Sequence, residues 1–465
     1  MTSRYTTPDK PARKAKLEEV EQDDSHHPAF ILSRPEVKLL AIAGVGFFLD
    51  AYDLFVINPV ATMLQYRLYD GHSLPTNLEG FVKAGANIGS VIGQFLFGYL
   101  ADAWGRKAVY GKELELIIVA TTLCLTTPTG SISPDGSLIY LGVFRILLGI
   151  GVGGDYPMSA SVTSDRAKLR KRGTMLAYIF SNQGWGSFMG SIIFMIVLQC
   201  YHHVMEIKGE VSKVDGVWRI VVGASLIPAF GTLYQRLRLP EAARYEEAQK
   251  MADEQYFEEE MKKQEKEAAD VTVHENPVPV SVARSHSSTS SENATVVHTE
   301  PTASTADEQQ GQGAKAAAAA KKRQWKIQFF GFLMEALFLG IMAGRFYQLS
   351  KPAFIVNFAL LQFFFNFGAN STTYIYPAEV FPTRFKGFAH GVSAASGKAG
   401  AIISALAFNS LSHKIGTPAV LWIFFGCSIG GALFTLLLPE VKMRDPDIVY
   451  EEEEREKRKI NRQSV

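Results

Sequence analysis

The stretch SLIYLGVFRILLGIGVGGDYPMSA, residues 137–160, decides the fold class. It is an apolar run of about 20 residues or slightly more, the length at which a helix crosses the hydrocarbon core of a bilayer. It also contains Arg145 and Asp155, which are costly to bury in lipid. The stretch therefore predicts a membrane helix that faces a protein interior and carries part of a functional site.

Similar apolar blocks recur along the chain, which has 465 residues, of which 47% are hydrophobic and only 20% are charged. A soluble enzyme would spread its apolar residues at helix or strand period instead of gathering them in blocks. We therefore expect an all-α polytopic membrane protein that is not an enzyme. The expected spans are 37–64, 78–101, 108–125, 137–160, 173–199, 217–234, 327–347, 353–376, 387–411 and 419–438.

Basic residues predict the orientation. With the N-terminus inside, the two tails and the short inner loops carry 22 Lys and Arg residues, whereas the outer loops carry 5. Such residues collect on the cytoplasmic side of a membrane protein. We therefore expect both termini in the cytoplasm and the protein in the plasma membrane, and the polar first 30 residues predict no cleavable signal peptide.

The composition divides the chain into five parts. A cytoplasmic tail at 1–36 precedes a half with six spans at 37–234, and a half with four spans at 325–439 precedes a second cytoplasmic tail at 440–465. The linker at 235–324 begins with charged, helix-forming residues and continues with a Ser/Thr-rich segment that cannot build a core. It predicts a cytoplasmic helix followed by disorder.

The two halves repeat each other in part. The sixth span is followed by LRLPEAARY and the tenth by LLLPEVKMR, while the fourth and eighth both lead through Tyr-Pro into a basic turn. The last three spans of the second half thus match the last three of the first. Repeated halves of six spans are typical of transporters, so the second half is expected to lack its first two spans.

Ionisable residues deep in a span are candidates for function. Lys398 lies near the middle of the ninth span among small residues that leave room for an anion or a carboxylate partner. Asp50 and Asp53 lie three residues apart on the first span, where they predict proton carriers or partners for a basic residue. In the fourth span, Arg145 is expected to be an electrostatic partner or to have a structural role.

For other residues of the spans we expect structural roles or positions near the membrane surface. Gly149 and Gly153 predict close helix packing, and Pro157 is expected to break the helix beside Asp155 and Tyr156. A dinucleotide-binding loop is excluded because no strand precedes these glycines. Lys83 and Glu115 remain open, and five residues near span ends are expected to reach the membrane surface. These are Lys38, Lys112, Glu113, Arg219 and Arg345.

Two segments resemble known transporter motifs. The loop GYLADAWGRKAVYG at 98–111 resembles the signature of the major facilitator superfamily, and PAEVFPTRFKG at 377–387 resembles its sugar-porter branch. The second copy of the signature is absent, in agreement with the two missing spans. Asp102 and Arg106 are four residues apart and can pair around the turn. The resemblance implies a gate formed by Asp102, Arg106, Glu379 and Arg384.

A closer resemblance rests on five of the spans. The segments DAYDLFVIN, RILLGIGVGGDYPMSASVTSDRA, SNQGWGSFMG, QFFFNFGANSTT and SAASGKAGA resemble fungal and plant proton-coupled inorganic phosphate symporters. This family implies proton coupling by Asp50 and Asp155. It also implies four contacts to phosphate, from Tyr156, Gln183, Asn370 and Lys398. The family usually has proline where this chain has Ala369.

Together these observations predict a proton-coupled phosphate symporter of the major facilitator fold, weakened by its missing spans. One alternative is a sugar or organic-phosphate porter, although a central lysine favours an anion. Another is a relative that binds phosphate as a sensor or regulator without transporting it. The expected partners are phosphate, protons and the lipid bilayer. No nucleic acid, cofactor or metal is expected, and the sequence predicts no oligomeric state.

Overall fold

The computed structural model describes residues 31–207, 211–242, 244–246, a few positions between 249 and 261, 324–438 and 445–463. Within them every regular element is a helix, which confirms the all-α class. The described helices belong almost entirely to one compact unit, which combines the chain up to Glu246 with Arg323–Val465. The expected N-terminal tail before residue 31 and most of the expected linker helix and disordered segment lie outside the described residues.

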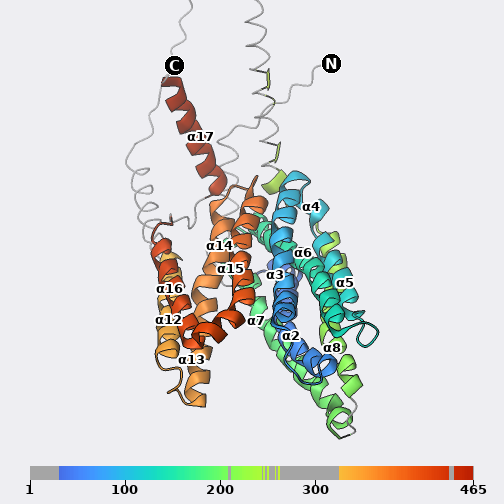
Figure 1. The fold of residues 1–465 in the computed structure, drawn as a ribbon. Coiled ribbons are helices and arrows are strands. Elements are labelled where there is room, and N and C mark those ends of the chain that lie inside the picture. Colours follow the sequence, from blue (N-terminus) through green and yellow to red (C-terminus); the bar gives the residue numbers. More distant parts are fainter. Residues whose placement is uncertain are drawn as a thin grey trace, which may run out of the picture. The chain divides into compact units, whose positions relative to one another are not determined.

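The first half of the chain forms the helices that the apolar blocks predict (Figure 1). The third and sixth predicted spans are each divided into two helices. The elements are α2 (Arg34–Leu68), α3 (Thr76–Ala103), α4 (Arg106–Val109), α5 (Lys112–Leu125), α6 (Pro134–Arg166), α7 (Leu169–His202), η1 (His203–Ile207), η2 (Val211–Lys213), α8 (Val214–Gly223) and α9 (Leu226–Leu237).

The second half contains four helical spans, as expected. The eighth predicted span is a continuous helical segment in which the π-helical turn η3 joins two α-helices. Such turns are frequent at functional sites. The elements are α12 (Gln324–Gly344), α13 (Lys351–Phe364), η3 (Phe365–Asn370), α14 (Ser371–Val380), α15 (Lys386–Ile415), α16 (Thr417–Thr435) and α17 (Pro446–Gln463).

Eight helical segments in the described part are long and apolar enough to cross a membrane. The other two predicted spans correspond to α3 and to α5, which has 14 residues. Both pack against α6 inside the first half. The protein is therefore a multi-pass membrane protein.

Local sequence signals set the beginnings of several helices. Ser33 and Glu36 form a capping box at the start of α2, where Ser33 N donates to Glu36 Oε2 at 2.6 Å. The Ser133 hydroxyl accepts from Gly136 N at the start of α6, and the Ser350 hydroxyl accepts in the same way at the start of α13. A proline follows each of these serines within two residues, as is usual in a first helical turn.

Helix α6 corrects one expectation. It runs from Pro134 to Arg166 without a break, so Pro157 does not interrupt it. A proline inside a helix removes one backbone hydrogen bond and crowds the preceding turn. That turn contains Gly153 and Gly154, whose backbone adapts to the ring more easily than that of other residues.

Helices α3 and α6 approach each other through glycines, which confirms the packing role expected of Gly149 and Gly153. A Cβ atom on Gly149 would lie 2.9 Å from Ala86 Cα, and one on Gly153 would lie 2.7 Å from Ser90 Cα. On the α3 side, a Cβ on Gly89 would lie 2.8 Å from the backbone nitrogen of Ile150. Only glycine allows the two backbones to lie so close.

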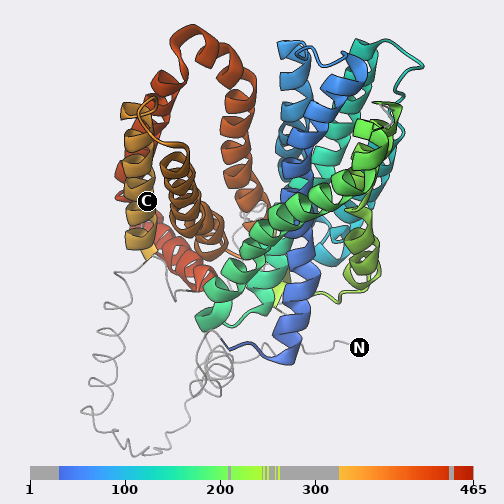
Figure 2. The same cartoon turned by 90° about the horizontal axis from the view of Figure 1, so that it is seen from below.

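Helix α15 joins the two halves. It contacts α3 and α6 on one side and α16 on the other, and Figure 2 shows it beside the first-half helices. Glycines again permit the approach, because a Cβ on Gly98 would lie 3.2 Å from Phe388 Cα. Residues of α3 and α15 therefore meet directly.

Replacing Gly149 with leucine is expected to destabilise the protein by about 3 kcal/mol, the upper end for overpacking, because the obstacle is backbone. Thermal unfolding in detergent measures the effect. Gly426→Leu is the matched control, since a Cβ on Gly426 of α16 meets nothing within 4 Å. Equal unfolding temperatures for the two variants would contradict the packing described here.

Candidate functional site

A polar cluster lies between the two halves at mid-length of the bundle. The Tyr156 hydroxyl donates to Asp50 Oδ2 at 2.6 Å. Gln183 Nε2 donates to the Tyr156 hydroxyl at 2.6 Å and lies 3.5 Å from Asp50 Oδ2. Lys398 Nζ lies 4.0 Å from the same carboxylate oxygen and 5.0 Å from the centre of the Tyr156 ring. Four residues from α2, α6, α7 and α15 thus converge on one point.

Asp50 is the buried member of the cluster, and the other three residues are partly exposed. Asp50 is 2% exposed, and the side chain of Lys398 is 13% exposed. Asp50 Oδ1 is buried and has no hydrogen-bond partner among the described residues. A buried carboxylate, a hydroxyl, an amide and an ammonium group together form a site that suits a small anion carrying hydrogen-bond donors and acceptors.

An aromatic wall borders the cluster. The ring centre of Phe47 lies 4.9 Å from that of Tyr156 and 5.0 Å from that of Tyr374 on α14. Phe180 stacks on Tyr374 with the ring centres 5.1 Å apart. The ring of buried His390 on α15 packs against the Tyr374 ring, and His390 Nε2 lies 3.1 Å from the backbone oxygen of Tyr374. These rings join the first half to the second and limit access of water to Asp50.

Asp53 lies in different surroundings from Asp50, although both are on α2. It lines a cavity of about 10 Å³ within the first half, together with Arg145, Cys124 and Trp218. Asp53 Oδ2 and Arg145 Nη2 are buried there without hydrogen-bond partners in the described part, and Arg145 Nε donates to the Val82 carbonyl at 2.9 Å. The cavity is of the size that holds one water molecule.

Asp155 does not face the polar cluster, although its neighbour Tyr156 does. Successive residues of a helix point about 100° apart. The carboxylate of Asp155 lies 2.5 Å from Arg236 Nη1, and the Ser159 hydroxyl donates to it at 3.0 Å. Arg236 Nη1 also lies 3.1 Å from Glu113 Oε1. Glu113 is 0% exposed, so the expectation that it reaches the membrane surface is wrong.

Asn370 lies at the end of the π-helical turn η3. Its amide donates to Asn366 Oδ1 at 3.1 Å. Among the described residues, no hydrogen bond joins Asn370 to Asp50, Tyr156, Gln183 or Lys398. Its role as a phosphate contact remains a prediction.

Charged residues gather at the end of the bundle where α3 and α6 end and α15 begins, here called the charged end. Arg106 forms an ion pair with Asp165 and lies 3.9 Å from Asp102. Burial lowers the pKa of the Arg106 guanidinium, and the attraction of the nearby Asp102 carboxylate offsets this only in part. The side chain of Lys386 lies 2.9 Å from Asp165 and is fully buried.

The charged end links the two halves. Arg106 Nη2 donates to the Thr383 carbonyl at 2.9 Å. Asp102 accepts from the backbone nitrogens of Gly387 at 3.1 Å and Phe388 at 2.7 Å. Because Asp102 and Arg106 belong to the first half and the other three residues to the second, these contacts hold the halves together at this end.

The start of α17 and the residue before it also contact the charged end. Asp447 accepts from the backbone nitrogen of Thr383 at 2.6 Å and from its hydroxyl at 2.7 Å. Arg244 forms an ion pair with Asp445. Of the other two expected gate residues, buried Glu379 lies beside Gly173 of α7, and the guanidinium of Arg384 lies 5.2 Å from the centre of the Phe385 ring.

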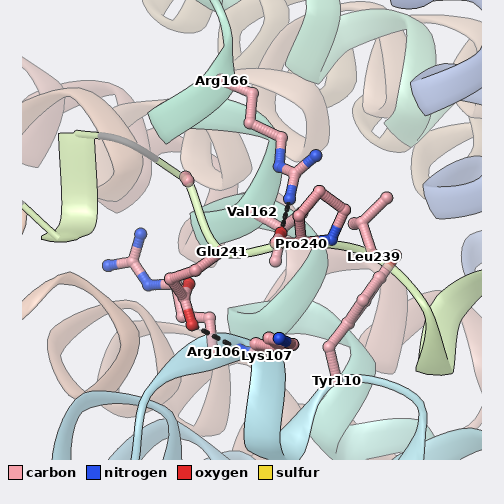
Figure 3. A pocket seen from close by; sticks show the side chains of 9 residues that line it. Arg106, Lys107, Tyr110, Val162, Arg166, Leu239, Pro240 and Glu241 are labelled. Carbon is pink, nitrogen blue, oxygen red and sulfur yellow. Dashed lines mark hydrogen bonds between the residues drawn. The ribbon is translucent and has the colours of Figure 1, made fainter.

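Figure 3 shows a small pocket at the charged end, bordered by α4, α6 and the segment after α9. Arg166 donates to the Pro240 carbonyl, and Lys107 N donates to Glu241 Oε2 at 2.8 Å. These bonds fix the segment Leu239–Ala242 against the ends of α4 and α6. The pocket has a volume of about 10 Å³, which is room for about one water molecule.

Several buried polar residues were not predicted as parts of a site. Arg236 and Lys386 lie at the ends of apolar blocks. Long basic side chains at such positions normally reach the membrane surface, so the sequence gives no sign that these two have buried partners. Glu335 lies well inside a predicted span, and this depth alone could have identified it as a candidate functional residue. It is 3% exposed, with Ser428 as a hydrogen-bond donor at 3.5 Å.

The fold resembles that of solved transporters. The proton:xylose symporter XylE of the major facilitator superfamily aligns with a TM-score of 0.64 over 89% of this chain and 98% of that chain. The identity is 17%, so this similarity establishes the fold alone. An inward-open structure of XylE from E. coli aligns with a TM-score of 0.57.

The sequence matches curated relatives more closely. A putative inorganic phosphate transporter of Schizosaccharomyces pombe is 37% identical over 93% of this chain and 91% of its own length. The inorganic phosphate transporter PHO84 of Saccharomyces cerevisiae is 32% identical over 90% and 84%, and the repressible high-affinity phosphate permease of Neurospora crassa is 31% identical over 88% and 85%.

The first of these alignments spans 522 positions, more than the 465 residues of this chain, so the relative has internal segments without a counterpart here. The model of the family called sugar (and other) transporter matches residues 39–291 and 322–447. With most of its length matched, the chain belongs to this transporter family, and its relatives include proteins that are named as inorganic phosphate transporters.

Proposed function

We propose that this protein binds inorganic phosphate at Lys398, Tyr156 and Gln183 and moves it across the plasma membrane together with protons. The observation that carries the proposal is the convergence of these three donors on Asp50, within 2.6 to 4.0 Å. Phosphate offers several acceptor oxygens to a hydroxyl, an amide and an ammonium group. The names of the relatives support phosphate as the anion.

Asp50 and phosphate compete for the same donors. While the Asp50 carboxylate is ionised, it engages Lys398 and Tyr156. Protonation removes its negative charge and weakens both contacts, because charge-assisted hydrogen bonds are the stronger kind. The freed donors then bind phosphate. Proton and anion therefore bind together: protonation of Asp50 frees the donors for phosphate, and phosphate, by occupying the donors, favours the protonated form of Asp50.

The membrane potential makes this coupling useful. Moving one negative charge inward against an inside-negative potential costs about 2.3 kcal/mol per 100 mV. One proton per dihydrogen phosphate cancels that cost, and a second makes entry favourable. We therefore include Asp53 beside Arg145 and Asp155 beside Arg236 as further proton sites, each of which has a basic neighbour within the first half.

We propose that the charged end faces the cytoplasm, as do both termini, because basic residues collect there. Asp102 and Arg106 close this end through their contacts to Thr383, Gly387 and Phe388. Glu379 and Arg384 are proposed as further parts of this gate.

Asn370 is proposed to contact phosphate from η3. The π-helical turn gives the backbone there a local irregularity at which a helix can reorient. Phosphate then has ligands from both halves, as a site at the centre of alternating access requires.

Replacing Asp50 with asparagine separates coupling from binding. The variant keeps the shape but carries neither charge nor exchangeable acid, so phosphate affinity is expected to lose its dependence on pH. Gln183→Ala is expected to keep that dependence and to weaken binding by about tenfold, since a buried hydrogen bond is worth about 1 to 3 kcal/mol. Titrations of phosphate binding at several pH values measure both; the same pH dependence in both variants would contradict this division.

Uptake of radiolabelled phosphate by cells that lack their own phosphate transporters tests the function itself. Inhibition by unlabelled phosphate but not by glucose or glycerol phosphate is the expected result. Inhibition by a sugar or an organic phosphate instead would identify a porter for that substrate. If cells take up no phosphate and the purified protein binds none, the proposal is rejected.

One observation favours a second function, phosphate binding without transport. The second half has four helical spans against six in the first. Alternating access depends on two comparable halves moving about one site. Phosphate binding by the purified protein without uptake by cells would support a sensor or regulator.

A further inference from the structure

Glu335 is a buried carboxyl group of the second half that is not part of the polar cluster. It lies near the middle of α12, which has 21 residues. Glu335 is 3% exposed, and its Oε1 atom is buried without a hydrogen-bond partner in the described part of the chain. A charged side chain at mid-length of a membrane helix is costly. The chemical state of this group is therefore the question that its position raises.

Glu335 lies where α12 packs against α16 (Figure 1). Phe332 of α12 lies so close to Gly431 of α16 that a Cβ atom on this glycine would lie 2.6 Å from the Phe332 ring. One turn along the same interface, Ser428 Oγ of α16 lies 3.5 Å from Glu335 Oε2. The carboxyl group is thus enclosed between two helices of the second half and is not turned toward lipid.

No cation balances Glu335 among the described residues. On α12 itself, Lys326 is nine residues away, which is about 13 Å along the helix axis. The elements packed against α12 are α13, η3, α14 and α16. Their titratable side chains are Lys351, Tyr374, Tyr376, Glu379 and Cys427. None of these forms an ion pair or a hydrogen bond with Glu335, whose polar partner is Ser428.

The Ser428 hydroxyl cannot stabilise an ionised Glu335. It lies within donating distance of two acceptors, the Phe424 carbonyl at 3.1 Å and Glu335 Oε2 at 3.5 Å. A hydroxyl has one proton and two lone pairs, and the shorter bond takes the proton. The lone pairs of Ser428 then face Glu335. Two acceptors that face each other need a proton between them, and Glu335 is the group that can carry it.

We propose that Glu335 is a proton-binding site of the second half, and that its proton joins α12 to α16. With the proton, the group is neutral and its O–H donates to Ser428 Oγ. Without the proton, a buried anion faces lone pairs, which is costly and favours separation of the two helices. This site lies outside the polar cluster and does not depend on the proposed function.

The same helix also contacts the π-helical turn. A Cβ atom on Gly331, one turn before Glu335, would lie 2.5 Å from Gly368 Cα of η3. Helix α12 thus packs on η3 through Gly331 and on α16 through Phe332 and Glu335. Loss of the proton therefore loosens the helix that supports η3, and the second half acquires a response to pH of its own.

Infrared spectroscopy of the purified full chain at neutral pH tests whether Glu335 carries a proton. Glu335→Gln keeps the shape of the neutral acid, so it is expected to fold. The spectrum of the unmodified chain minus that of this variant is expected to show the carbonyl band of a protonated carboxylic acid. Glu115→Gln is the matched control, because this partly exposed glutamate pairs with Lys112 and is expected to show ionised carboxylate bands. Ionised carboxylate bands from Glu335 would overturn the inference.

Unfolding in detergent at several pH values tests the link to packing. The folded chain holds the proton, whereas an exposed glutamate loses it above about pH 4.3. Relative to Glu335→Gln, the unfolding equilibrium constant of the unmodified chain is therefore expected to rise by up to tenfold per pH unit above that value. A ratio that does not change with pH would overturn the inference. Stabilisation by sodium chloride but not by potassium chloride would also overturn it, because Glu335 and Ser428 would then bind a metal ion.

Discussion

Replacing Lys398 with alanine is expected to weaken phosphate binding by about 100-fold. The anion would lose its positively charged partner, and a charge-assisted hydrogen bond of this kind is worth about 3 kcal/mol. Lys398 is also the cation that lies 4.0 Å from the Asp50 carboxylate, so its loss makes the pocket more negative for an incoming anion. Titration of the purified protein with inorganic phosphate measures the effect.

Lys112→Ala provides the control for this experiment. That lysine lies at the start of α5, where its side chain is 56% exposed and pairs with Glu115. Its removal changes the net charge by the same amount without touching the site, so affinity is expected to stay the same. Equal affinities of the Lys398→Ala variant and the unmodified chain would show that phosphate binds elsewhere.

Inserting two membrane spans taken from a complete relative, between Lys322 and Trp325, is expected to raise phosphate uptake from near background to a level comparable with that relative. The four-span half lacks the helices that would face α2 across the site by the repeat of the two halves. Two spans preserve the orientation of every later span, so the rest of the protein is undisturbed. Uptake in cells lacking phosphate transporters measures the gain.

The same insertion with a scrambled apolar sequence is the matched control, because it adds mass and membrane area without the facing residues. Only the family sequence is expected to restore uptake. Strong pH-driven uptake by the unmodified 465-residue chain would contradict the idea that the missing spans limit transport.

The spans could be predicted from sequence because hydrocarbon imposes a length on every helix that crosses it. That constraint needs no knowledge of tertiary contacts. The same reasoning placed Lys398 and Asp50 deep in the membrane, and the structure brings them within 4.0 Å of each other. Tyr156 and Gln183 came from the resemblance to phosphate symporters, and their convergence on Asp50 depends on how α6 and α7 pack.

Neighbouring residues were harder to separate. Asp155 and Tyr156 are adjacent in the sequence and are both candidate site residues, yet their side chains point to different sides of α6, one to Arg236 and one to Asp50. The helical period of 3.6 residues already required this division. Asp50 and Asp53 differ in the same way, since only Asp53 lines the cavity with Arg145.

Partners at span ends could not be found from sequence. Arg236 and Glu113 both lie where a long side chain normally reaches water. What buries them is the approach of α2, α5, α6 and α9 to one another, which is a property of the folded bundle. Hydropathy reports only how apolar a segment is. It cannot distinguish a side chain that reaches water from one that reaches a neighbouring helix.

The glycine contacts between α3 and α6 have a mechanical consequence. Helices whose backbones lie this close cannot slide past each other easily, so we expect α3 and α6 to move together. Asp102 at one end of this pair holds Gly387 and Phe388 of α15, and Tyr156 of α6 lies in the polar cluster. We therefore expect any opening of the charged end that moves this pair to displace Tyr156 as well.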